Sequence, residues 1–145
     1  MAELSAERAA EIQEVITRVT EWVAERRDVV GLLLVGSVAR GAARDDSDLD
    51  LVVLSTDPAG YANLGWATGL GFEEPIRVQE WGVITERRFR TASGLEVEFG
   101  FGEPGWAGVD PVDPGTRRVV ADGCRPLHDP LGVLARLLAA CQPAH

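Results

Sequence analysis

A run of seven residues without a polar side chain constrains this chain more than any other feature. Residues 29–35 read Val-Val-Gly-Leu-Leu-Leu-Val, and the run stops at Gly36-Ser37. A short, continuous run of branched apolar residues is typical of a strand that is buried on both faces of a sheet. The sequence therefore predicts a central strand over residues 29–35.

The segments around this run complete the pattern of an α/β fold. Apolar residues recur at helical spacing over residues 6–27, with Ser5 as the candidate N-cap. Residues 102–115 are expected to form a long surface connection. Further strands are expected over residues 48–54, 76–84, 85–91, 95–101 and 124–127, and further helices over residues 63–70, 116–121 and 130–140, the last capped by Asp129. This order predicts an α/β (α+β) fold, a mixed β-sheet flanked by helices, in a single domain over residues 1–145.

The charge composition excludes several classes of site. The chain has a formal net charge of -9, and all 14 of its basic residues are Arg. Because the sequence contains no Lys, a lysine Schiff base and a P-loop lysine are both excluded. Non-specific nucleic-acid binding needs a basic surface, so we expect no nucleic-acid partner.

The sequence carries no pattern of a targeting or membrane segment. Its N-terminus is acidic and amphipathic, unlike a signal peptide, and no apolar stretch approaches the ~20 residues that cross a bilayer. Cys124 and Cys141 lack the spacing of a metal or redox motif. We expect a soluble, cytoplasmic protein with reduced cysteines and no membrane partner.

Two short motifs indicate the chemistry. Gly36-Ser37 ends the apolar run, and Asp48-Leu49-Asp50 follows after ten residues. Glycine lets the backbone turn and approach a phosphate, and Ser37 offers a hydroxyl and an N–H to its oxygens. Asp48 and Asp50 lie two apart on a strand, so their side chains share a face. Such carboxylates repel each other unless a cation lies between them, and Mg²⁺ prefers these oxygens, so the motifs predict a divalent-metal site beside a phosphate-binding turn.

A third carboxylate is expected from the strand over residues 95–101. Its alternating pattern directs the apolar residues toward the core and places Glu96 and Glu98 on the opposite face. Two outward glutamates are usually solvated surface, but beside a second carboxylate pair a shared metal site is the sharper interpretation. Glu98 lies deeper in the strand and is the preferred third ligand, with Glu96 left open.

These residues resemble the signature of the DNA polymerase beta-like nucleotidyltransferase superfamily. The signature is an apolar residue, Gly, then Gly or Ser, a spacer of about ten residues, and Asp-apolar-Asp-apolar; here it reads Leu34-Val35-Gly36-Ser37 and Ser47-Asp48-Leu49-Asp50-Leu51. The chain is most similar to small stand-alone members and to the N-terminal domains of aminoglycoside adenylyltransferases. The resemblance implies two Mg²⁺ ions on Asp48, Asp50 and Glu98, a nucleoside triphosphate on Gly36 and Ser37, and help from Glu98 in deprotonating an acceptor hydroxyl.

Other residues near the motifs are candidates with plainer alternatives. Arg40 and Arg44 flank the turn, and Ser47 opens the second half of the signature; all three are candidate nucleotide contacts or else solvated loop residues. The arginines at positions 87, 88 and 90 are interpreted as an exposed strand face rather than a triphosphate clamp. The tryptophans at positions 66, 81 and 106 are interpreted as packing residues rather than base-stacking residues.

The resemblance implies transfer of AMP from ATP to a hydroxyl of a small molecule or a protein. An acidic cleft would suit a cationic acceptor such as an aminoglycoside. Two alternatives stay open: a partner-binding, antitoxin-type member of a toxin–antitoxin pair, and an inactive nucleotide-binding member. A homodimer and a toxin partner are both compatible with the sequence.

Overall fold

A mixed β-sheet forms the centre of the molecule. The computed structural model describes residues 3–81 and 83–142, and this part of the chain contains a six-stranded sheet in the order β3-β4-β5-β2-β1-β6. The strands are β1 (Val29–Val35), β2 (Leu49–Ser55), β3 (Arg77–Trp81), β4 (Ile84–Arg90), β5 (Glu96–Gly102) and β6 (Cys124–His128). Strands β2 and β5 run parallel, and every other neighbouring pair is antiparallel. The predicted mixed sheet is confirmed.

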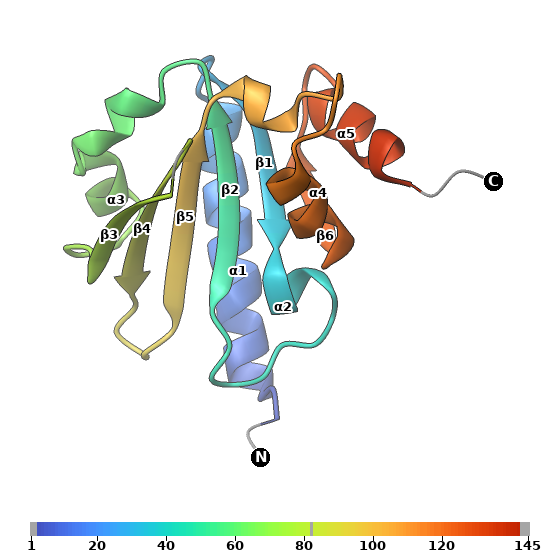
Figure 1. The fold of residues 1–145 in the computed structure, drawn as a ribbon. Coiled ribbons are helices and arrows are strands. Elements are labelled where there is room, and N and C mark those ends of the chain that lie inside the picture. Colours follow the sequence, from blue (N-terminus) through green and yellow to red (C-terminus); the bar gives the residue numbers. More distant parts are fainter. Residues whose placement is uncertain (1–2, 82, 143–145) are drawn as a thin grey trace.

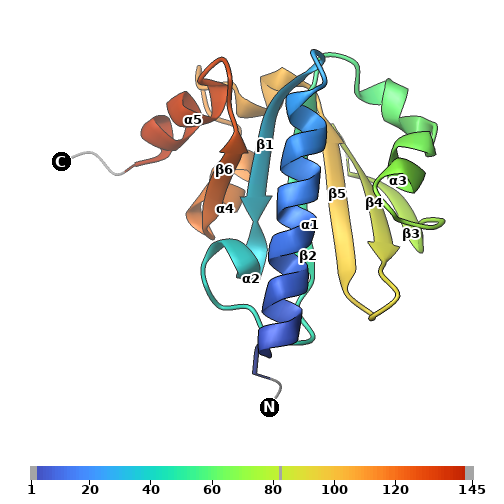
Figure 2. The same cartoon turned by 180° about the vertical axis from the view of Figure 1, so that it is seen from behind.

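Helices cover both faces of this sheet. They are α1 (Ala6–Ala24), α2 (Gly36–Ala39), α3 (Gly65–Gly69), α4 (Pro114–Ala121) and α5 (Val133–Cys141), together with the 3-10 turns η1 (Pro58–Ala62) and η2 (Pro104–Ala107). Helix α1 lies along one face, whereas α4 and α5 lie on the other side near β1 and β6 (Figures 1 and 2). Among the described helices, none combines the length and apolarity that a membrane span requires.

The central strand β1 is buried on both faces, as the continuous apolar run predicts. Leu32 and Leu34 pack in the core beneath α1, and Leu33 packs in a second core beneath α5; all three side chains are fully buried. Strand β6 pairs with the outer side of β1 and forms one edge of the sheet, as expected for residues 124–127.

The core beneath α1 is built around an aromatic cluster. Trp66 on α3 has its ring 5.5 Å from that of Phe89, 5.1 Å from Phe99 and 5.2 Å from Phe101, and it stacks on Trp22 of α1 at 5.4 Å. The packing role expected for Trp66 is therefore found. Trp106 likewise packs against the second core, while the side chain of Trp81 lies outside the described part of the structure.

The second core corrects the expectation for residues 102–115. This segment is not only a surface connection, because Ala107 and Val112 are 5% and 8% exposed and pack beneath α5. The backbone is fixed there by the Thr116 hydroxyl, which donates to the carbonyl of Trp106 at 2.9 Å. Pro104 opens the 3-10 turn η2, and Pro114 opens helix α4.

The last helix starts later than predicted. It begins at Val133 rather than at residue 130, because residues 129–132 make an additional turn that ends with Gly132 at φ 74°. Asp129 still caps the helix from a distance, since its carboxylate accepts from the N–H groups of Leu134 at 3.0 Å and Ala135 at 2.9 Å.

Candidate functional site

The turn after β1 lies against the carboxylate of β2. Gly36 has φ +77°, a conformation that residues with a β-carbon rarely adopt, and a β-carbon at this position would lie 2.6 Å from Oδ2 of Asp50. The contact follows from the register, which pairs Val35 with Asp50 across the antiparallel β1 and β2 strands. The predicted glycine–serine turn and the predicted aspartate are therefore direct neighbours.

Three of the predicted carboxylates share one face of the sheet. Asp50 lies in β2 opposite Glu98 in the parallel strand β5, and Asp48 immediately precedes β2. The intervening Leu49 is fully buried on the α1 side. This alternation leaves Asp48, Asp50 and Glu98 together on the opposite face.

Their proximity is visible in the electrostatics of Asp50. Burial, the carboxylate of Glu98 and that of Asp48 raise the pKa of Asp50 to about 7, and the guanidinium of Arg88 offsets only part of this effect. Glu98 thus lies in register with Asp50, whereas Glu96 lies level with Asp48 and shares Nη1 of Arg88 with it.

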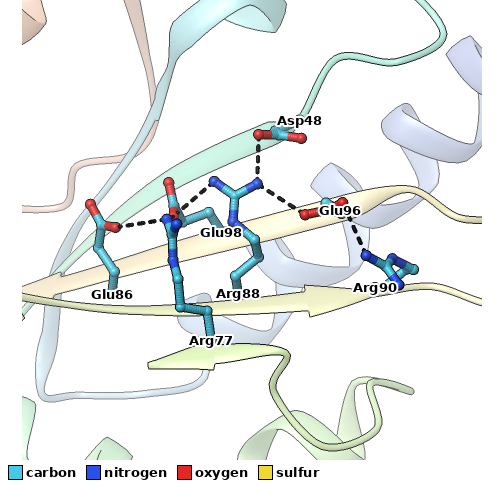
Figure 3. Close-up of polar contacts among 7 residues, drawn as sticks. All are labelled: Asp48, Arg77, Glu86, Arg88, Arg90, Glu96 and Glu98. Carbon is cyan, nitrogen blue, oxygen red and sulfur yellow. Dashed lines mark hydrogen bonds and ion pairs between the residues drawn. The ribbon is translucent and has the colours of Figure 1, made fainter. Parts of the chain in front are cut away.

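Arg88 lies at the centre of the acidic cluster, which corrects its interpretation as an exposed residue. Figure 3 shows its guanidinium between Asp48, Glu96 and Glu98. Nη1 donates to Asp48 Oδ2 at 2.6 Å and to Glu96 Oε1 at 3.1 Å, and Nη2 donates to Glu98 Oε1 at 3.0 Å. Only 16% of the Arg88 side chain is exposed. Arg87 is also buried, so of the three arginines only Arg90, at 55% exposure, fits the exposed-face interpretation.

Two further arginines extend the cluster across the sheet. Arg77 on β3 donates to Glu98 at 3.0 Å and lies 3.7 Å from a carboxylate oxygen of Glu86 (Figure 3). Arg90 donates to Glu96 at 3.3 Å. Sequence reasoning missed the ion pairs between β4 and β5. The hairpin turn at 91–95 places Arg88 opposite Glu98 and Arg90 opposite Glu96, and opposite charges favour such cross-strand positions.

The carboxylates of Asp48, Asp50 and Glu98 have the chemistry of divalent-cation ligands, although the Arg88 guanidinium contacts two of them. Within residues 3–81 and 83–142, no three acidic, histidine or cysteine side chains stand together as metal ligands do. Instead, the Arg88 guanidinium contacts Asp48 and Glu98 at once. Carboxylate oxygens from adjacent strands are nevertheless the donors that Mg²⁺ prefers. Burial and the two neighbouring carboxylates raise the pKa of Asp50, and a bound cation would favour its ionised form; Oδ2 of Asp50 occupies the space that a β-carbon at Gly36 would fill.

The remaining predicted contacts do not join the cluster in this structure. Arg40 is exposed and lies beside Gly123. Arg44 is exposed and lies 3.8 Å from Asp46. The Ser47 hydroxyl accepts from the backbone N–H of Arg44 at 2.8 Å, so it stabilises the turn that leads to Asp48.

Comparison with known proteins gives one match that covers most of the site. The family model described as "Nucleotidyltransferase domain" matches residues 16–98, more than half of the chain, and this range includes Gly36, Asp48, Asp50 and Glu98. No curated protein matches the chain significantly.

Solved structures give weaker likenesses. A cytoplasmic RNA terminal U-transferase aligns with a TM-score of 0.47 and 21% identity over 69% of this chain and 31% of its own. The Cid1 poly(U) polymerase aligns with a TM-score of 0.45 and 21% identity over 69% and 32%. Cid1 in complex with the UTP analog UMPNPP aligns with a TM-score of 0.47 and 20% identity over 69% and 32%. The chain thus spans about a third of the length of these structures.

Proposed function

The chain belongs to the nucleotidyltransferase domain family, and from this premise we propose that it transfers a nucleoside monophosphate, AMP from ATP first, to an acceptor hydroxyl. The observation that carries the proposal is the convergence of Asp48, Asp50 and Glu98 from adjacent strands beside the Gly36 turn. In this proposal the three carboxylates are the metal ligands, and the backbone of the Gly36-Ser37 turn beside them binds the phosphates.

Asp48, Asp50 and Glu98 are the residues that would hold two Mg²⁺ ions. Bound there, Mg²⁺ supplies charge neutralisation for the triphosphate and for the attacking oxygen. The raised pKa of Asp50 supports this assignment, since a nearby cation favours the ionised carboxylate that the cluster alone disfavours.

The turn and Glu98 have separate tasks in the proposed reaction. Gly36 allows close approach of a phosphate, and Ser37 provides its hydroxyl and backbone N–H to the phosphate oxygens. Arg40 and Arg44 are proposed as further contacts to the triphosphate, and Ser47 as a residue that shapes the loop beneath it. Glu98 accepts the proton of the acceptor hydroxyl. The acceptor oxygen then bonds to the α-phosphorus while the bond from that phosphorus to pyrophosphate breaks.

The proposed acceptor is a small cationic molecule such as an aminoglycoside. The chain has a net charge of -9, and the face that carries the site presents five acidic side chains, those of Asp48, Asp50, Glu86, Glu96 and Glu98, against the arginines at positions 77, 88 and 90. An acidic surface concentrates cationic ligands near it. A protein hydroxyl is a second acceptor of the same reaction class.

The test is pyrophosphate release from each of the four common nucleoside triphosphates with Mg²⁺. The acceptor panel contains aminoglycosides, a serine- and tyrosine-containing protein and a short RNA, which tests the expectation of no nucleic-acid partner. Asp48→Ala and Asp50→Ala should abolish release, whereas Asp46→Ala, an exposed loop control, should retain it. Acceptor-dependent release that survives both site substitutions would contradict the proposed mechanism.

A further inference from the structure

Arg88 neutralises the carboxylates that the proposed reaction needs. Its two terminal nitrogens contact Asp48, Glu96 and Glu98 within 3.1 Å, and two of these three partners are the proposed metal ligands. A guanidinium is a permanent cation, so it competes with any divalent ion for the same oxygens. Arg77 contacts Glu98 as well, but 48% of its side chain is exposed, where an ion pair contributes little.

We propose that Arg88 is a positioning residue that acts through Asp48 and Glu98 as an internal counter-ion, and that it must leave these carboxylates before a divalent cation binds. This inference rests on the proposed function only for the identity of the metal ligands. In this proposal a residue of β4, a strand outside the signature motifs, sets the affinity of the site for a divalent cation.

Arg88 has a second carboxylate partner to which the guanidinium can remain bound after it leaves the proposed metal ligands. Nη1 is shared between Asp48 and Glu96, and Glu96 is not a proposed metal ligand. Arg88 therefore keeps a carboxylate partner in Glu96 when Asp48 and Glu98 are released. Within the described part of the chain, Nε of Arg88 is buried without a hydrogen-bond partner. An unsatisfied buried donor is costly, so the present arrangement does not satisfy the guanidinium fully.

The contacts of Glu96 give it a separate task in the cluster. Its carboxylate accepts from Arg88 at 3.1 Å and from Arg90 at 3.3 Å. Glu96 thus offers Arg88 a partner when Asp48 and Glu98 bind a cation.

The experiment measures Mn²⁺ binding directly, by electron paramagnetic resonance of free Mn²⁺, without nucleotide or acceptor. Arg88→Met keeps the apolar stem and removes the charge, and we expect it to bind Mn²⁺ about tenfold more tightly than the unmodified chain. Arg88→Lys retains a positive charge and should bind more weakly than Arg88→Met. Arg90→Met is the matched control on the same strand and face, and its affinity should stay unchanged. Equal or weaker binding by a folded Arg88→Met would overturn the inference.

A second measurement uses the unmodified chain and does not depend on the folding of any variant. The Nε–H resonance of Arg88, assigned by triple-resonance NMR, should shift as Mg²⁺ is added, while that of Arg90 should not. An Arg88 signal that stays fixed while Mg²⁺ binds would contradict displacement.

Turnover separates this inference from the proposed function. If no acceptor supports pyrophosphate release yet Arg88→Met tightens Mn²⁺ binding, the proposed function fails and the inference stands. If turnover depends on Asp48 and Asp50 but Arg88→Met leaves Mn²⁺ affinity unchanged, the function stands and the inference fails.

Discussion

Gly36 faces the carboxylate of Asp50 so closely that a β-carbon at position 36 would lie 2.6 Å from Oδ2. The two residues come from different halves of the signature and meet because β1 pairs with β2 in antiparallel register. The glycine therefore has two reasons to be there: its positive φ and the space that the aspartate occupies.

Gly36→Ala should reduce nucleotidyl transfer by about 100-fold, because the methyl group displaces Asp50 from its position. Gly41→Ala is the control, since Gly41 has a similar φ of +72° but no neighbour within 4 Å of the added carbon. Both variants should lose about 1 kcal/mol of unfolding free energy from backbone strain. Equal loss of turnover in the two variants would show that strain, rather than contact with Asp50, matters.

Glu98 and Glu96 should differ in their importance to the reaction. Glu98→Gln should lower kcat by about 100-fold, because Glu98 lies in register with Asp50 and is a proposed metal ligand and base. Glu96→Gln should change kcat by less than about tenfold, since Glu96 pairs with Arg88 and Arg90 instead. Steady-state kinetics at saturating Mg²⁺ makes the comparison, and the reverse ranking would reassign the third carboxylate.

Asp50 should make the protein less stable as the pH rises. Its pKa is raised from 3.8 to about 7, so between these values the unfolded chain ionises while the folded chain does not. In metal-free buffer Asp50→Asn should match the unmodified chain near pH 4 and exceed it at pH 8 by about 4 kcal/mol of unfolding free energy. Urea denaturation at the two pH values measures the difference.

Asp46→Asn serves as the control for this pH dependence. Asp46 is a loop residue with a 71% exposed side chain, and its substitution should change the unfolding free energy by less than about 0.5 kcal/mol at either pH. A stability gain for Asp50→Asn that is the same at pH 4 and pH 8 would show that the raised pKa is not its cause.

Trp66 should matter for stability and not for nucleotide binding. Its ring packs among Phe89, Phe99 and Phe101 on the α1 side of the sheet, opposite the face that carries Asp50. Trp66→Leu should lower the unfolding free energy by about 2 to 3 kcal/mol while KM for the triphosphate stays within about twofold. A folded variant with unchanged stability and a raised KM would restore the base-stacking alternative.

Much of the architecture could be predicted because the hydrophobic patterns of individual strands and helices depend on residues close together in the sequence. The apolar run of β1 and the alternation of β5 follow from a strand geometry with a two-residue period, which is a property of the local backbone. The start of α5 was predicted wrongly because Asp129 can cap at a distance once Gly132 adopts a positive φ.

The sequence by itself determined which side chains share a face: Asp48 with Asp50, and Glu96 with Glu98, because neighbouring strand residues point to opposite sides. Only the tertiary structure decided that β5 lies parallel to β2 and brings Glu98 to Asp50, and that β4 places Arg88 among Asp48, Glu96 and Glu98. Strand order and register depend on burial and pairing between segments 40 residues apart in the chain, such as Asp48 and Arg88. For that reason Arg88, which the sequence indicated as part of an exposed face, lies in the fold among the carboxylates that it neutralises.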